Sequence, residues 1–104
     1  MNIKDCRNIY ISKSKVDGIG IFTDSDIKKN EIFCCAIKDN NITYYGSKVN
    51  HCITNKNVDL QKKNNDYYFV AINDIKKNDE ILMDYTDSKV PGFIDKRTDG
   101  FINC

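Results

Sequence analysis

Short apolar runs separated by polar turns recur along the chain, at intervals of roughly ten residues. The clearest runs are residues 9–11, 19–22, 31–37, 58–60, 67–72 and 80–85, with a shorter β-rich piece at 42–45. Polar turns lie between them, among them 16–18, 39–41 and 61–66. No segment repeats apolar residues at helical spacing over three turns. The pattern therefore predicts a mainly β fold, either a barrel or a set of small packed sheets.

One polar stretch occurs twice in the chain. The sequence DIKKNEI at residues 26–32 recurs as DIKKNDEI at residues 74–81. In each copy an isoleucine precedes a polar turn, and the asparagine (Asn30 or Asn78) adopts positive φ at little cost. We expect two similar turns that each lead into a strand, and a duplicated binding site is the alternative.

Size and charge restrict the class of protein. The 104 residues suit one small domain, and 16 basic against 15 acidic residues leave a formal charge of +1. This balance argues against a general nucleic-acid binder, which carries a strong basic excess. No apolar run approaches the roughly 20 residues of a membrane span, and the first ten residues lack the apolar stretch of a signal peptide. We expect a single domain over residues 1–104, nuclear or cytoplasmic and not secreted.

The cysteine pattern does not indicate cross-links or a metal. None of the five cysteines forms a CxxC pair; they are Cys6, Cys34, Cys35, Cys52 and Cys104. Structural zinc sites and disulfide frameworks normally show closely spaced pairs. We therefore expect free thiols, most of them buried as small apolar groups, and no metal site.

Taken singly, the residues that could carry chemistry are weak indicators. Gly18 and Gly20 flank Ile19 after a predicted turn, where glycine lets a backbone approach a ligand closely. His51 is the only histidine, and a lone histidine is more often structural than catalytic. A nucleophilic pair of His51 with Cys52 is disfavoured because neighbours on a strand point to opposite faces.

The order of these features is more informative than any one of them. Gly-Ile-Gly at 18–20 is followed by Tyr-Gly at 45–46, Asn-His at 50–51 and Glu-Ile-Leu-Met-Asp-Tyr at 80–85. This series resembles the SET domain of protein-lysine methyltransferases in its smallest, stand-alone form. The resemblance covers about residues 11–94, and the Asn-His step with the Glu-Ile-x-x-x-Tyr ending is its most specific part.

The resemblance implies a fold and an activity. The fold is a β-clip-like SET domain of short strands in small sheets, with a pseudoknotted C-terminal segment that threads under a loop near Asn-His. The activity is transfer of a methyl group from S-adenosyl-L-methionine to a lysine side chain of a protein or peptide, with histone tails as one acceptor class. No direct nucleic-acid or membrane partner is implied. The alternatives are a weak or inactive SET-like domain that binds peptide or cofactor, and an unrelated small β barrel used for protein contacts.

The resemblance also implies which residues hold the methyl donor. The backbone of Gly18, Ile19 and Gly20 lines its methionine and ribose portions. Asn50 hydrogen-bonds the donor, and His51 offers mainly its backbone to the adenine.

The remaining implied positions are aromatic residues and one asparagine. Tyr85 corresponds to the active-site tyrosine, with its hydroxyl near the reacting methyl group. Tyr45 and Phe93 are expected to form aromatic walls, Tyr45 in the catalytic lysine channel and Phe93 in the adenine pocket. The family's second asparagine corresponds to Asn55 or Asn57.

One departure from the family pattern concerns the substrate groove. Only eight residues separate Cys35 from Tyr44, where larger members carry a helical insert. Peptide specificity therefore does not transfer, and a second subunit in a homodimer is one source of the missing wall.

Overall fold

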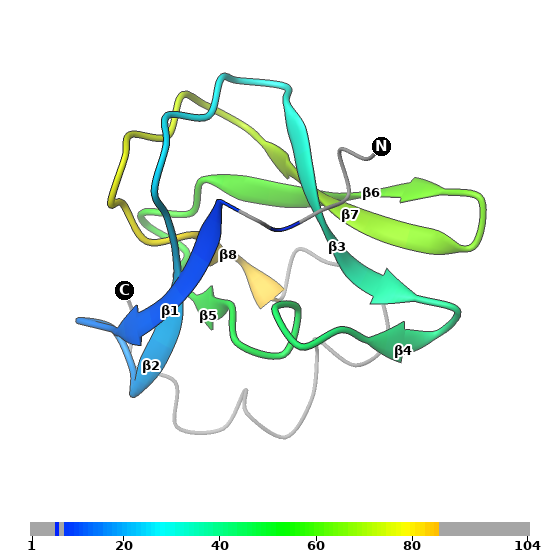
Figure 1. Ribbon diagram of the computed structural model, residues 1–104, viewed down its shortest axis with the longest axis horizontal. Helices are drawn as coiled ribbons and strands as arrows, with labels where there is room; N and C mark the ends of the chain where they lie inside the picture. The colour runs from blue at the N-terminus through cyan, green and yellow to red at the C-terminus, as the bar shows by residue number, and fades with distance from the viewer. Residues whose placement is uncertain (1–5, 7, 86–104) are drawn as a thin grey trace.

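The longest apolar run of the sequence forms a central strand of the larger sheet. The computed structural model describes Cys6 and residues 8–85 (Figure 1). Strand β3 (Ile32–Lys38) pairs antiparallel with β7 (Asp66–Ala71), which pairs antiparallel with β6 (Val58–Lys63). Phe33 and Cys34 are successive residues of β3, and both are buried. The register with β7 shifts between Ile32 and Cys34 and again between Cys35 and Ile37, so the buried residues of β3 come in adjacent pairs and its sequence does not alternate between apolar and polar residues.

Three very short strands complete the larger sheet. Strand β4 (Asn41–Ile42) pairs with β3 at one edge, while β8 (Leu82–Met83) pairs in parallel with both β6 and β5 (Asn50–His51) at the other. The strand order is β4-β3-β7-β6-β8-β5. In Figure 1, β5 and β8 lie side by side near the middle of the molecule. Parallel pairing of β5 with β8 brings together two segments that are some thirty residues apart in the chain.

The N-terminal hairpin forms a second, two-stranded sheet. Strands β1 (Ile9–Lys13) and β2 (Ile19–Thr23) pair antiparallel around a turn in which Gly18 has a φ of 49°. A bridge between Phe22 and Glu80 joins this hairpin to the rest of the fold. The hairpin is thereby held against the segment that enters β8.

The duplicated turns contact each other. Ile27 and Ile75 exchange backbone hydrogen bonds of 2.8 Å in both directions. Asn30 and Asn78 have φ angles of 75° and 74°, the left-handed conformation predicted from the sequence. The two copies of the repeat therefore build one paired structure, in which each turn leads into its own strand or bridge.

The core lies between the two sheets and is dominated by aliphatic and aromatic side chains. Its fully buried members include Ile21, Phe69, Ile75 and Ile81, none more than 1% exposed. The mainly β fold is confirmed, because the described residues contain strands and turns but no α-helix. Within those residues, no helix is long and apolar enough to cross a membrane. The predicted pseudoknot and Phe93 fall on residues outside the described part of the chain.

Three predicted strand boundaries differ from the structure. The piece predicted at 42–45 is a strand only at 41–42, and the predicted polar turn at 61–66 is mostly the arm of the β6–β7 hairpin. The predicted strand at 80–85 pairs regularly only over 82–83. At 44–45 the chain turns because the Thr43 hydroxyl accepts a hydrogen bond from the Gly46 amide (3.0 Å). The prediction also omitted β5, whose two residues carry no local pattern.

The prediction of free thiols is wrong. Cys6 and Cys34 form a disulfide, with their Cα atoms 4.9 Å apart, and Cys52 is also disulfide-bonded. Cys35 keeps its thiol, which contacts the Ile37 carbonyl. Cys34 is fully buried on β3, in the core cluster against which Cys6 packs. Pairing over 28 residues of chain depends on this tertiary contact, which cysteine spacing does not encode. The described residues contain no cluster of metal-binding side chains.

Candidate functional site

Three segments that are distant in sequence lie around the parallel pair β5–β8. These are the glycine turn at 18–20, strand β5 and the residues that follow β8 up to Tyr85. The register pairs Asn50 with Leu82 and His51 with Met83. Tyr85 therefore comes two residues after the end of β8, and it contacts β5 and the residue before it. This convergence brings together Gly18, Ile19 and Gly20, then Asn50 and His51, and finally Tyr85.

Tyr85 is held at both its backbone and its side chain. Its hydroxyl donates a hydrogen bond to the Val49 carbonyl, and its backbone amide donates to Nδ1 of His51 (2.9 Å). The residue is 3% exposed. Two bonds to the segment 49–51 thus fix the direction of the phenol ring.

His51 is buried and neutral in this arrangement. Because Nδ1 accepts the Tyr85 amide hydrogen, the single hydrogen of the neutral ring is on Nε2. Burial lowers the pKa of His51 below its ordinary value of 6.5, and the Asp84 carboxylate acts in the opposite direction. The imidazole also packs against the Tyr85 ring, with the centroids 5.1 Å apart.

Asn50 ties β5 to the glycine turn. Its Nδ2 donates to the carbonyl oxygens of Asp17 (3.0 Å) and Ile19 (3.1 Å) and to Oε2 of Glu80 (3.0 Å). The residue is 3% exposed. The carboxamide is therefore a structural connection between two of the three predicted donor-binding segments.

Glu80 is a site residue whose side-chain role the sequence analysis missed. Both of its carboxylate oxygens accept from the Ser14 hydroxyl at 2.9 Å, and Oε2 also accepts from Asn50. A Cβ on Gly20 would overlap this carboxylate and lie 2.9 Å from Nδ2 of Asn50. A side chain at position 20 would therefore displace the Glu80 carboxylate from its place beside Asn50. The available signal was the place of Glu80 at the start of the quoted Glu-Ile-x-x-x-Tyr motif.

Asn57, and not Asn55, braces strand β8. The Asn57 carboxamide donates to the Glu80 carbonyl (2.8 Å) and accepts from the Leu82 amide (2.9 Å). Asn55 has an exposed side chain, and its backbone amide points to the sulfur of Cys52. The alternative that the sequence left open is therefore decided by the hydrogen bonds of Asn57.

Tyr45 lies on the turn that precedes Val49. Its ring is partly buried against the core and meets the ring of Tyr44 edge-on, at 5.4 Å between centroids. Tyr44 is 61% exposed, and the Lys48 ammonium lies 5.6 Å from its ring. An aromatic pair with a neighbouring cation thus borders the segment that holds Tyr85.

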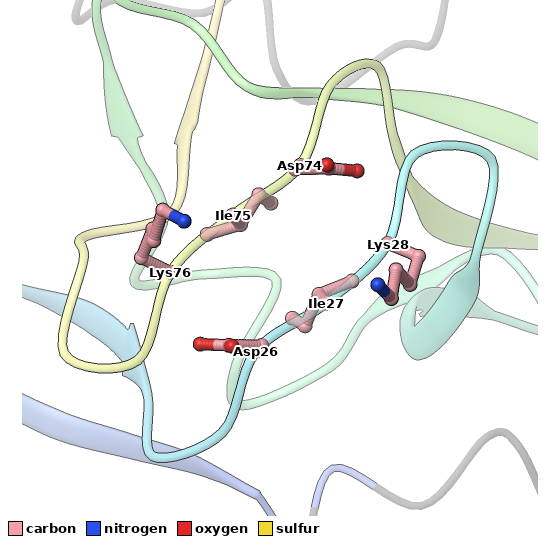
Figure 2. A pocket seen from close by; sticks show the side chains of 6 residues that line it. All are labelled: Asp26, Ile27, Lys28, Asp74, Ile75 and Lys76. Atoms are coloured by element: carbon pink, nitrogen blue, oxygen red, sulfur yellow. The ribbon is translucent and has the colours of Figure 1, made fainter.

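The paired turns form a small pocket away from these residues. Figure 2 shows Ile27 and Ile75 next to each other, with the side chains of Asp26, Lys28, Asp74 and Lys76 around them. The two carboxylates face backbone: Asp74 accepts from the Lys29 amide (2.9 Å) and Asp26 from the Lys77 amide (2.8 Å). These reciprocal bonds account for the repeated acidic residue as a turn-stabilising group.

Comparison with known families identifies the arrangement. A model of the SET domain matches residues 35–86 of the chain. The chain belongs to the SET-domain family. The match covers β5 and β8 with the residues around them, which include Asn50, His51 and Tyr85.

Solved structures of Chaetomium thermophilum Polycomb Repressive Complex 2 share the fold. The apo complex with mutations in Ezh2 has a TM-score of 0.64 at 20% identity, over 86% of this chain and 16% of that chain. The complex bound to S-adenosylmethionine has a TM-score of 0.63 at 18% identity, over 82% and 16%. This chain therefore spans about a sixth of the length of those chains.

A Plasmodium falciparum crystal structure is more similar in sequence and in length. This candidate histone methyltransferase is 31% identical with a TM-score of 0.61, over 79% of this chain and 96% of that chain. No curated protein matches the chain. Family membership and this relative support a methyltransferase.

Proposed function

We propose that this protein is an S-adenosyl-L-methionine-dependent protein-lysine N-methyltransferase, with histone lysine as one acceptor class. One observation carries the proposal. The Tyr85 hydroxyl bonds to Val49, the residue directly before Asn50, whose side chain bonds to the glycine turn. The proposed catalytic phenol and the proposed donor-binding turn are therefore joined through two consecutive residues.

The residues at the glycine turn fit the donor. A Cβ on Gly18 would meet no atom within 4 Å, so the turn has open space beside it. Ile19, the residue between the glycines, is 47% exposed and offers an apolar surface next to the Asn50 carboxamide. When bound there, S-adenosylmethionine supplies a methyl group on a positively charged sulfur.

The aromatic residues suit the acceptor. A lysine amine attacks a sulfonium methyl in line, so its nitrogen must be aligned with the carbon and sulfur at close distance. The amine must also be neutral, and apolar walls favour loss of its proton by desolvating the ammonium. Tyr85 and Tyr45 provide such walls, and aromatic faces attract the arriving cation. The Tyr85 hydroxyl orients the amine beside the reacting methyl group.

The proposal extends to the substrate, the cellular location and the oligomeric state of the protein. The partner is a protein or peptide that presents a lysine, and the chain acts in the nucleus or cytoplasm. A homodimer supplies the substrate wall that the short segment between Cys35 and Tyr44 lacks. We expect Phe93, which lies outside the described residues, in the wall of the adenine pocket.

A domain that binds donor or peptide without turnover is the second candidate. The observation that favours it is the state of Tyr85, whose hydroxyl is nearly inaccessible and committed to the Val49 carbonyl. In this case the same residues hold the cofactor, while the phenol serves the fold.

Two assays separate the candidates. Isothermal titration with S-adenosylmethionine measures donor binding, and transfer of labelled methyl groups to core histones and a lysine peptide library measures turnover. The enzyme shows saturable binding and lysine-dependent label. The binding domain shows saturable heat without label, and absence of both results contradicts the proposal.

A further inference from the structure

We propose that His51 is a positioning residue for Tyr85, and that a proton on its Nδ1 exchanges the Tyr85 amide for the Asp84 carboxylate as its partner. The inference rests on the proposed function, because it concerns the tyrosine assigned to methyl transfer. It differs from the role implied by family resemblance, in which His51 contributes mainly its backbone.

The first step is the bond between the two residues. Nδ1 of His51 accepts from the Tyr85 amide at 2.9 Å, within a region where His51 is 6% and Tyr85 3% exposed. The imidazole packs against the Tyr85 ring at 5.1 Å, tilted by 59°. His51 therefore fixes both the backbone and the ring of Tyr85, while Val49 fixes the hydroxyl.

The second step is the effect of a proton. Imidazolium has a hydrogen on each nitrogen, so Nδ1 can no longer accept from the Tyr85 amide. Oδ1 of Asp84 is 3.8 Å from this nitrogen, and the Asp84 side chain is 12% exposed. A protonated Nδ1 is therefore drawn to the carboxylate, and the Tyr85 amide loses its acceptor.

The charged group next to His51 favours this change of hydrogen-bond partner. Among the described residues, Asp84 is the charged group that acts on His51, and the Tyr85 phenol is the titratable ring in contact with it. Burial lowers the pKa of His51 and Asp84 opposes that shift, so the neutral form is the one present at pH 7 and above. The exchange occurs below pH 6.5, and catalysis by Tyr85 is lost in the acid form.

Two substitutions at position 51 separate positioning from bulk packing. In His51→Asn, Oδ1 stands at the place of Nδ1 and accepts from the Tyr85 amide without titrating. In His51→Phe, the ring volume remains but the acceptor is lost. In the pH profile of kcat, His51→Asn is expected to lose the part of the acid limb that comes from His51, while the part that comes from protonation of the acceptor lysine remains. His51→Phe is expected to lose roughly tenfold to a hundredfold in kcat, with KM for the donor nearly unchanged.

A structural measurement on the 104-residue chain tests the inference without turnover. In an NMR titration from pH 8 to pH 5, the Tyr85 amide resonance and the His51 ring should shift with one common midpoint below 6.5. In His51→Asn the Tyr85 amide should not titrate in this range. A Tyr85 amide that is constant in wild type while His51 titrates overturns the inference, as does equal kcat in His51→Phe and wild type. If no methyl transfer is found while the two midpoints coincide, the proposed function fails and the His51–Tyr85 coupling stands.

Discussion

The Tyr85 hydroxyl donates a hydrogen bond to the Val49 carbonyl, across 36 residues of chain. The next residue, Asn50, bonds to the carbonyls of Asp17 and Ile19. One short segment therefore sets both the direction of the phenol and the position of the glycine turn. The phenol and the glycine turn are thus joined through two adjacent residues.

Tyr85→Phe should reduce methyl transfer strongly while the fold persists. The substitution removes the hydroxyl and leaves the buried Val49 carbonyl without this donor, which costs about 1–3 kcal/mol in the free energy of unfolding. Labelled-methyl transfer and urea unfolding measure the two effects. The matched control is Tyr10→Phe, which removes an exposed hydroxyl bonded to Asn78. Equal transfer rates for Tyr85→Phe and wild type would refute the assignment of Tyr85.

Glu80→Ala should loosen the glycine turn and weaken donor binding. The variant removes the acceptor of Ser14 and Asn50, two partly buried hydrogen bonds that join the hairpin to β5 and β8. We expect a loss of about 1–3 kcal/mol in the free energy of unfolding and a higher Kd for S-adenosylmethionine by titration. Glu31→Ala, which removes an exposed carboxylate bonded to the Lys28 amide, is the control. An unchanged Kd in Glu80→Ala would show that the turn does not depend on this carboxylate.

Gly20→Ala should destabilise the protein by a different route. The added methyl group overlaps the Glu80 carboxylate and approaches Nδ2 of Asn50 to 2.9 Å, so the carboxylate or the turn must shift and the bonds of Glu80 to Ser14 and Asn50 are disturbed. Overpacking of this kind costs about 1–3 kcal/mol. Gly18→Ala adds a methyl group in open space, so its cost comes from the positive φ of that position alone, about 1–2 kcal/mol. Thermal unfolding measures both variants, and a Gly20→Ala protein as stable as wild type would contradict the packing described.

Protein stability should fall as the pH is lowered below 6.5. The folded-state pKa of His51 is below its ordinary value of 6.5, so below that pH the unfolded chain binds the proton more readily than the folded one. The contribution of His51 is thus complete above pH 6.5 and is lost as the pH falls toward its folded-state pKa. Urea unfolding of wild type and His51→Asn at several pH values isolates this contribution. If the difference between the two proteins does not change between pH 8 and 5, His51 is not buried in its neutral form.

Cys6→Ser should weaken the fold without touching the candidate site. The disulfide closes 28 residues of chain, and its loss costs about 3–4 kcal/mol in the chain-entropy model. Urea unfolding of wild type and Cys6→Ser measures the effect, and a thiol reductant should weaken wild type at least as much, because it also breaks the disulfide of Cys52. Cys35→Ser, which changes the neighbouring thiol, is the control. If reduction and Cys6→Ser both leave the urea midpoint unchanged, this disulfide does not stabilise the protein.

The sequence alone predicted the strands whose own residues form a clear apolar or aromatic run. The apolar run of β3 and the aromatic run of β7 can be recognised from a few consecutive residues. Asn30 and Asn78 have the positive φ angles expected of them. Strand β5 was not predicted because two residues show no period, and its partner β8 comes some thirty residues later. The Cys6–Cys34 disulfide likewise depends on a tertiary contact.

The candidate site was predicted by motif order and corrected by geometry. Asn50 and Tyr85 were identified from the order of short motifs, and the structure places them on joined segments. The choice of Asn57 over Asn55 needed the hydrogen bonds to β8. The role of Glu80 as an acceptor for two partners was not predicted, because its place at the start of the Glu-Ile-x-x-x-Tyr motif does not show which side chains it contacts.

The most direct test of the account is a crystal structure of the protein soaked with S-adenosylmethionine. The account predicts that the donor lies along the turn formed by Gly18, Ile19 and Gly20, beside Asn50, with its methyl group directed to the Tyr85 hydroxyl. A donor bound elsewhere, or a methyl group directed away from Tyr85, would contradict it.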